Sequence, residues 1–309
     1  MTFKSIIPKP LSRGSIVGVA AISGLVNPKD LENGVFFLKK LGLEVRLARN
    51  VYFKEDYLAG SDAERAECLN EFITDPEVRG IFFARGGYGA MRVLSQINYD
   101  AILSDPKIMI GMSDITALSM AVFSQVGLIT LAGPMLAGQV SSGLDKDSET
   151  SLVEALTHPI ERYQIMRKLE PSKLKILQTG KTTGYLLGGC LSLIVSLIGV
   201  PYCPNFGDCV LFIEDVNEPA YKIDRMLTQM KLAGIFDHLR GIIICQFSGD
   251  DPEVTMATVE RVVLDYVKSS SVPVISNYPH GHTLPNMTLP VGLPVKFEVS
   301  ESSVTLHIL

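Results

Sequence analysis

The first 126 residues repeat one local pattern, in which an apolar, β-branched run is followed by a segment that opens on helix-capping residues. Asn27-Pro28 puts a capping side chain before a proline at the first helical position, and Ser61-Asp-Ala-Glu64 is a capping box for a helix to about Thr74. Strands that alternate with helices favour a parallel sheet with both faces covered, and such sheets hold their sites at the carboxyl ends of the strands. The expected strands are 15–21, 43–48, 81–84 and 107–110.

A change of composition after Gly138 divides the chain. Residues 141–175 are polar and charged with one expected helix, 148–156, and we interpret them as a connecting segment between domain 1–140 and domain 176–309. The second domain mixes strands with helices. The predicted fold class is therefore α/β, with an N-terminal parallel-sheet (flavodoxin-like) domain and a C-terminal β-rich mixed domain. The expected strands of the second domain are 210–213, 241–245, 272–276, 295–299 and 303–308, with a helix at 220–232.

Composition restricts the partners and the compartment. The net charge is −5 and basic residues do not cluster, which argues against nucleic acid as a partner. The five cysteines are odd in number and lack C-x-x-C spacing, as expected for reduced core residues. The uncharged stretch 182–207 is interrupted by glycines and prolines, so a bilayer span is not expected. We expect a soluble cytoplasmic protein that does not bind membranes.

The stretch 107–116 is the strongest candidate for chemistry in the first domain. Its apolar run ends at Gly111, and Ser113 then precedes an expected helix from Asp114 to Val122. A strand that turns sharply into a helix can expose a serine hydroxyl and direct the first helical N–H groups at whatever that hydroxyl attacks. The alternative is a plain β-α turn in which Ser113 or Asp114 caps the helix.

A glycine-rich loop, Ala84-Arg-Gly-Gly-Tyr-Gly89, follows the third expected strand. Glycines let the backbone approach a ligand closely and turn its N–H groups toward an anion. Neither the G-x-x-x-x-G-K-[ST] nor the G-x-G-x-x-G phosphate motif is present. The loop therefore favours an oxyanion or carboxylate site beside Ser113.

The chain has five histidines, so the base can be sought by elimination, and the acid can be sought among carboxylates in apolar surroundings. His280 and His282 stand in a loop rich in glycine and proline, and if that loop is extended both rings can face one site. Glu214 ends an apolar strand, where a carboxylate is out of place unless it is paired or used. The alternative is that Glu214 or Asp215 caps the next helix or pairs with a basic residue on the surface, either Lys222 or Arg225. Serine, acid and histidine follow the order of α/β-hydrolases, although Ile115 replaces the second glycine of their G-x-S-x-G elbow.

Several motifs together resemble the LD-carboxypeptidases, serine peptidases that include muramoyltetrapeptide carboxypeptidase and the microcin C self-immunity protein. The similarity covers nearly the whole chain. Its motifs are Ala84-Arg-Gly-Gly-Tyr-Gly89, Gly111-Met-Ser-Asp-Ile-Thr-Ala117, Gly133-Pro134, 184–191, Phe212-Ile-Glu-Asp215, Asp224-Arg-Met-Leu227, and the segment from Gly281-His-Thr to Leu289-Pro-Val-Gly292.

The resemblance implies a role for each matched residue. Ser113 is the expected nucleophile, His282 the general base and Glu214 the acid that orients it. The backbone N–H of Asp114, with one from Gly86 or Gly87, is expected to form the oxyanion hole. The resemblance also implies an active site between the two domains, a homodimer, and no metal or organic cofactor.

The expected reaction is release of the terminal D-alanine from murein tetrapeptide in cell-wall recycling, by cleavage of the meso-diaminopimelate–D-alanine bond. Arg85 and Tyr88 are candidate substrate contacts, and a salt bridge beneath the loop is the alternative for Arg85. Three positions depart from the usual family pattern. Cys190 stands where asparagine is usual, Ile22 replaces a proline, and His280 replaces a phenylalanine.

Three alternatives remain at the level of sequence. The first is a family member that hydrolyses a microcin C-like peptide-nucleotide or another acylated amino acid. The second is a metallohydrolase that uses His280 and His282 with Asp250 or Asp251, which a chelator would inhibit. The third is a binding protein that kept the fold and lost the chemistry.

Overall fold

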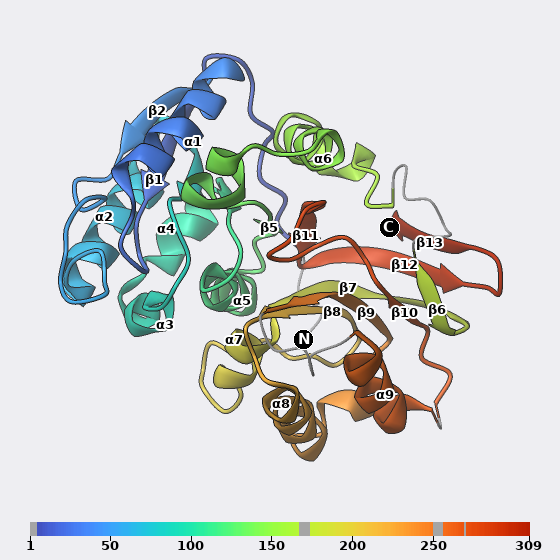
Figure 1. Cartoon of the computed structure of the whole chain (residues 1–309). Coiled ribbons are helices and arrows are strands. Elements are labelled where there is room, and N and C mark those ends of the chain that lie inside the picture. Colours follow the sequence, from blue (N-terminus) through green and yellow to red (C-terminus); the bar gives the residue numbers. More distant parts are fainter. Residues whose placement is uncertain (1–4, 167–173, 250–255, 269) are drawn as a thin grey trace.

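The computed structural model describes residues 5–166, 174–249, 256–268 and 270–309. Two sheets organise it, as the sequence predicted (Figure 1). The first has the strand order β11-β5-β4-β3-β1-β2, and all its neighbours are parallel except β11 and β5. Its strands are β1 (Ile16–Ala20), β2 (Glu44–Leu47), β3 (Val78–Phe83), β4 (Ile108–Ile110), β5 (Thr130–Ala132) and β11 (Leu289–Val291).

The second sheet has seven strands in the order β13-β12-β7-β8-β9-β10-β6. Strands β7 to β10 are parallel to one another, and antiparallel strands flank them on both sides. The strands are β6 (Lys175–Gln178), β7 (Gly180–Cys190), β8 (Cys209–Val216), β9 (Gly241–Ser248), β10 (Val274–Ser276), β12 (Leu293–Val299) and β13 (Val304–Ile308). The mixed character predicted for this half of the chain is confirmed.

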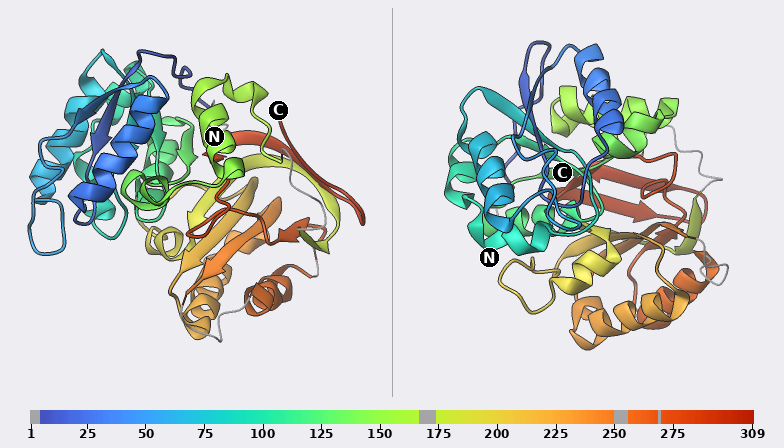
Figure 2. Two further views of the ribbon diagram at one scale, coloured as in Figure 1. Left: turned by 45° about the horizontal axis from the view of Figure 1, so that its top comes forward. Right: turned by 60° about the vertical axis from the view of Figure 1, so that its left-hand side comes forward.

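The first two helices begin at the capping residues that the sequence predicted. The Asn27 side chain accepts from the N–H groups of Lys29 and Asp30, and the Ser61–Glu64 capping box is complete. In Figure 2, α1 to α5 accompany the first sheet and α7 to α9 the second. The helices are α1 (Pro28–Lys40), α2 (Asp62–Thr74), α3 (Ala90–Val93), α4 (Tyr99–Ser104), α5 (Ile115–Val126), α6 (Lys146–Thr157), α7 (Leu191–Ser196), α8 (Ala220–Leu232) and α9 (Met256–Val267).

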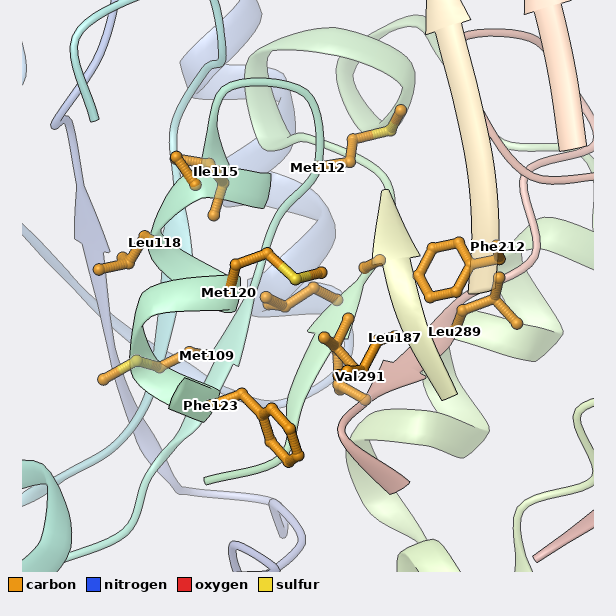
Figure 3. Close-up of a cluster of buried hydrophobic side chains, with 14 of the residues drawn as sticks. Met109, Met112, Ile115, Leu118, Met120, Phe123, Leu187, Phe212, Leu289 and Val291 are labelled. Atoms are coloured by element: carbon orange, nitrogen blue, oxygen red, sulfur yellow. The ribbon is translucent and has the colours of Figure 1, made fainter. Parts of the chain in front are cut away.

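Helix α5 lies where the two sheets meet. All of its residues from Ile115 to Phe123 are buried, which fits a sequence that is apolar all round rather than on one stripe. Figure 3 shows its side chains facing Leu187 of β7 and Val291 of β11, and the ring of Phe123 lies 5.9 Å from that of Tyr185. The helix that follows Ser113 is therefore held from both halves of the molecule.

Four strands were missing from the sequence prediction, namely β5, β6, β7 and β11. Strand β11 comes from the range assigned to the second domain, yet it pairs antiparallel with β5 in the first sheet. Strand β7 contains Gly188, where a Cβ would lie 1.9 Å from the carbonyl oxygen of Phe212 on β8. Glycine is needed there because the two backbones approach so closely. In the described parts of the chain, no helix has the length and apolar character needed to cross a bilayer.

Candidate active site

Two loops leave the first sheet at the same edge. Strands β3 and β4 are parallel neighbours, with Phe82 opposite Ile110, so the segments that follow them emerge side by side. After β3 comes Ala84–Gly89, called here the glycine loop. After β4 comes the turn into α5 that carries Ser113. The structure thus puts both candidate segments at the carboxyl ends of the strands, as parallel sheets predict.

Ser113 has a backbone conformation that non-glycine residues rarely adopt. Its φ is 59°, one of five positive values among the described non-glycine residues. Such strain persists where surrounding structure imposes it, and it often marks a functional site. The side chain is partly exposed, and the glycine loop packs closely on it. A Cβ on Gly86 would lie 2.9 Å from the Ser113 hydroxyl oxygen.

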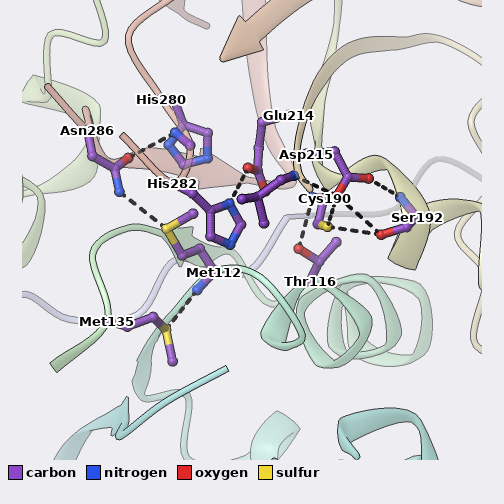
Figure 4. A network of polar contacts seen from close by, with 12 residues as sticks. Met112, Thr116, Met135, Cys190, Ser192, Glu214, Asp215, His280, His282 and Asn286 are labelled. Carbon is purple, nitrogen blue, oxygen red and sulfur yellow. Dashed lines mark hydrogen bonds and ion pairs between the residues drawn. The ribbon is translucent and has the colours of Figure 1, made fainter. Parts of the chain in front are cut away.

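His282 and Glu214 form a hydrogen-bonded pair between the loop after β10 and strand β8. The Nδ1 atom of His282 lies 2.8 Å from Oε2 of Glu214, whose side chain is fully buried (Figure 4). Burial lowers the pKa of His282, but the hydrogen bond and negative charge of Glu214 outweigh it, so the pKa is raised above its usual 6.5. The bond at Nδ1 orients the ring and leaves Nε2 for a second partner.

Two amides tie the His282 loop to the segment that carries Ser113. Gln139 Nε2 donates to the carbonyl of Gly281 at 2.9 Å and lies 3.7 Å from the sulfur of Met112. Asn286 Nδ2 lies 3.2 Å from the same sulfur and its Oδ1 accepts from the Gly281 N–H. Because Met112 precedes Ser113 and Gly281 precedes His282, these contacts hold the two segments against each other. The sequence analysis assigned no role to either amide, although Asn286 lies within the segment 281–292 that contributes to the family resemblance.

The expectation that both loop histidines face one site is wrong. His280 is fully buried, its Nδ1 lies 2.9 Å from the Met287 carbonyl, and its ring packs edge-on against Phe212. Burial lowers its pKa to about 4. The two rings diverge because Gly281 between them has a φ of 138°, so the chain is not extended there.

The surface alternatives proposed for Glu214 and Asp215 are not what the structure shows. Asp215 is also buried, accepts from the Ser192 N–H at 2.8 Å and lies 3.2 Å from the Cys190 sulfur. Burial raises the pKa of Asp215. Lys222 instead pairs with Glu218 at 3.5 Å.

The remaining candidates occupy different environments. Arg85 is exposed and its Nη1 donates to the Leu25 carbonyl at 2.6 Å, rather than forming the salt bridge beneath the loop. Tyr88 is half exposed and its ring lies 5.9 Å from that of Tyr57. Ile22, one of the departures from the family pattern, is buried.

Metal ligation by His280 and His282 finds little geometric support. Within the described ranges, His, Cys, Asp and Glu side chains do not gather in threes as a metal site would require. Asp250 and Asp251, the carboxylates considered for such a site, lie outside the described residues.

Comparison with known proteins identifies the family. Residues 17–133 match the LD-carboxypeptidase N-terminal domain and residues 183–297 match the LD-carboxypeptidase C-terminal domain. A probable murein peptide carboxypeptidase of Bacillus subtilis is 35% identical over 302 residues, covering 97% of this chain and 94% of the relative. The chain therefore belongs to the LD-carboxypeptidase family, and family membership supports a serine carboxypeptidase-type enzyme.

Relatives with different names share this fold. The microcin C7 self-immunity protein MccF of Escherichia coli is 28% identical over 330 residues, covering 97% of this chain and 95% of the relative. The crystal structure of an MccF-like protein from Bacillus anthracis superposes with a TM-score of 0.87 at 26% identity, covering 99% of both chains. A muramoyltetrapeptide carboxypeptidase from Oxalobacter formigenes has the same fold, with a TM-score of 0.79 at 24% identity, covering 94% of this chain and 97% of that one.

Proposed function

We propose that this protein is a serine LD-carboxypeptidase that releases the terminal D-alanine of murein tetrapeptide by cutting the meso-diaminopimelate–D-alanine bond. The observation that carries the proposal is the hydrogen bond from His282 to the buried Glu214, in a loop that Gln139 and Asn286 hold against the strained turn of Ser113. The relative named murein peptide carboxypeptidase supports the choice of substrate.

In the proposed mechanism, the Ser113 hydroxyl attacks the carbonyl carbon of the L-configured centre while His282 Nε2 takes its proton. Glu214 holds the ring through Nδ1 and stabilises the imidazolium. His282 then protonates the leaving amine of D-alanine, and an acyl-enzyme remains on Ser113. Water, deprotonated by His282, attacks the acyl carbon and releases the tripeptide with a new carboxylate.

The backbone N–H groups of Asp114 and of Gly87, or of Gly86, are proposed to stabilise the oxyanion of each tetrahedral intermediate. Each such donor is typically worth about 3 kcal/mol of activation free energy. The close packing of Gly86 on Ser113 supports this assignment, because donors must lie beside the attacked carbonyl. In this scheme the two donors together contribute about as much as the base.

Substrate binding is proposed to involve Arg85 and Tyr88 at the outer side of the glycine loop. Arg85 uses one N–H on Leu25, and its further N–H donors suit the terminal carboxylate of the substrate. The exposed Tyr88 ring, with that of Tyr57, offers an apolar contact for the peptide. Replacing Arg85 with glutamine is expected to raise KM and leave kcat nearly unchanged.

The test uses a defined murein tetrapeptide with terminal D-alanine, and the same peptide with terminal L-alanine as the stereochemical control. Mass spectrometry is expected to show release of D-alanine only. A fluorophosphonate is expected to add once, at Ser113. Ser113→Ala should abolish both results, whereas Ser119→Ala, a buried serine on the same helix, should retain them. Turnover by Ser113→Ala, or turnover abolished by a chelator, would contradict the proposal.

A second candidate is hydrolysis of a microcin C-like peptide-nucleotide, favoured by the MccF relative that covers 97% of this chain. An aminoacyl sulfamoyl adenosine assayed beside the murein peptide distinguishes the two by the ratio of kcat/KM values. Binding of either compound with no turnover would instead identify a binding protein.

We further propose that the protein is a cytoplasmic homodimer. Cell fractionation would test the compartment, and light scattering would test the oligomeric state.

A further inference from the structure

We propose that the Asp114 carboxylate is the positioning group of the oxyanion hole, because it holds the glycine loop against Ser113 from two sides. The inference rests on the proposed function, since it concerns the groups that would stabilise the oxyanion. It assigns to the side chain of Asp114 a role separate from that of its backbone N–H.

The carboxylate makes unusual contacts for its position in the chain. Asp114 is the N-cap residue of α5, where an aspartate normally accepts from the N–H groups of its own helix. It makes no such bond. It is instead 1% exposed, and its Oδ2 accepts from the Ser23 hydroxyl at 2.5 Å and from the Ala90 N–H at 2.7 Å. A buried carboxylate is costly unless it is well bonded, so its partners are structurally significant.

One of these bonds holds the end of the glycine loop. Ala90 is the first residue of α3 and directly follows Gly89. Its N–H bond to Asp114 therefore joins the loop's carboxyl end to the residue after Ser113. A bond between segments that flank the two proposed oxyanion donors restricts how far those donors can move apart.

The other bond acts through Ser23 on the middle of the loop. Gly24, which follows Ser23, donates its N–H to the Gly86 carbonyl at 3.1 Å. In a trans peptide the C=O and the next N–H point in opposite directions. The Gly87 N–H consequently points away from Gly24. Asp114 thus orients the Gly87 N–H, one of the proposed oxyanion donors, through Ser23, Gly24 and the Gly86 carbonyl.

A buried arginine reinforces the arrangement. Arg65 is fully buried, and its guanidinium donates to the carbonyls of Ile22 and of Gly89. These two carbonyls belong to the same segments that Asp114 holds. Burial raises the pKa of Asp114, while the bonds from Ser23 and Ala90 and the charge of Arg65 oppose that rise.

The experiment compares Ser23→Ala with Ser276→Ala. Ser276 is a matched control, because it is also fully buried and donates to a buried carboxylate, Glu260 Oε1, at 2.7 Å, but on β10 in the second sheet. Ser23→Ala is expected to lower kcat about tenfold with KM nearly unchanged. Ser276→Ala should lower the melting temperature about as much as Ser23→Ala does, but it should keep the kcat of the unmodified protein. Asp114→Asn is expected to lower kcat about a hundredfold.

A tetrahedral analogue separates positioning from general damage. A peptide boronate that bonds to Ser113 should bind more weakly to Ser23→Ala and Asp114→Asn, by the same factor as kcat/KM falls. Substrate affinity, measured for both in a Ser113→Ala background, should not change. Unaltered kcat in folded Ser23→Ala, or equal losses of boronate and substrate affinity, would overturn the inference. If the unmodified protein shows neither turnover nor Ser113 labelling, the proposed function fails and this inference fails with it.

Discussion

Replacing His280 with phenylalanine should remove one specific sensitivity of the fold to acid. The ring is fully buried, and its Nε2 has no hydrogen-bond partner among the described residues. Its pKa is lowered to about 4, against 6.5 for the ordinary side chain. Between these values the unfolded chain binds a proton that the folded chain does not. Stability from this group is therefore lost as the pH falls.

The size of the effect follows from the two pKa values. At a pH below both pKa values, the full loss in the free energy of unfolding is about 3 kcal/mol. At pH 5 the loss relative to pH 7.5 is about 2 kcal/mol. Phenylalanine keeps the packing on Phe212, sacrifices the bond to the Met287 carbonyl and cannot titrate. We therefore compare the free energies of unfolding of His280→Phe and of the unmodified protein. The difference, variant minus unmodified protein, should be about 2 kcal/mol more positive at pH 5 than at pH 7.5.

Urea unfolding of both proteins at pH 7.5 and pH 5 measures this change in the free-energy difference, and the titrations of all other groups cancel in it. A control for His282 is needed because its charge also lowers the pKa of His280. Repeating the four measurements in a His282→Gln background gives the effect of His280 alone. A free-energy difference between the two proteins that is equal at both pH values would refute the reasoning, since it would show that the buried ring titrates normally.

Three further predictions test the site and the strand contacts. Gly86→Ala should lower kcat/KM at least about a hundredfold with little loss of melting temperature, because its Cβ would meet Ser113. Glu214→Gln should lower kcat about a thousandfold and move the acid limb of the kcat/KM–pH profile to lower pH, because His282 must be neutral to act and loses the charge that raises its pKa. Gly188→Ala should destabilise by about 3 kcal/mol in urea, against about 1 kcal/mol for the unobstructed Gly143→Ala.

The sequence by itself determined the local elements of the first half of the chain. The caps at Asn27 and Ser61 act within a few residues, so their hydrogen bonds could be predicted without knowing the rest of the fold. The turn from β4 into α5 was equally local. Strand β11 was missed because three residues containing Pro290 carry almost no strand signal, and their pairing with β5 depends on residues far away in sequence.

Only the tertiary structure decided which polar groups meet. Glu214 and His282 were both candidates from sequence, but their contact depends on how β8 and the loop after β10 are placed in space. His280, two residues away, is sealed in the core because Gly281 turns the chain. The contacts of the Asp114 carboxylate were equally unpredictable from its capping position. Periodicity and caps are properties of neighbouring residues, whereas burial and hydrogen-bond partners are set by packing between distant segments.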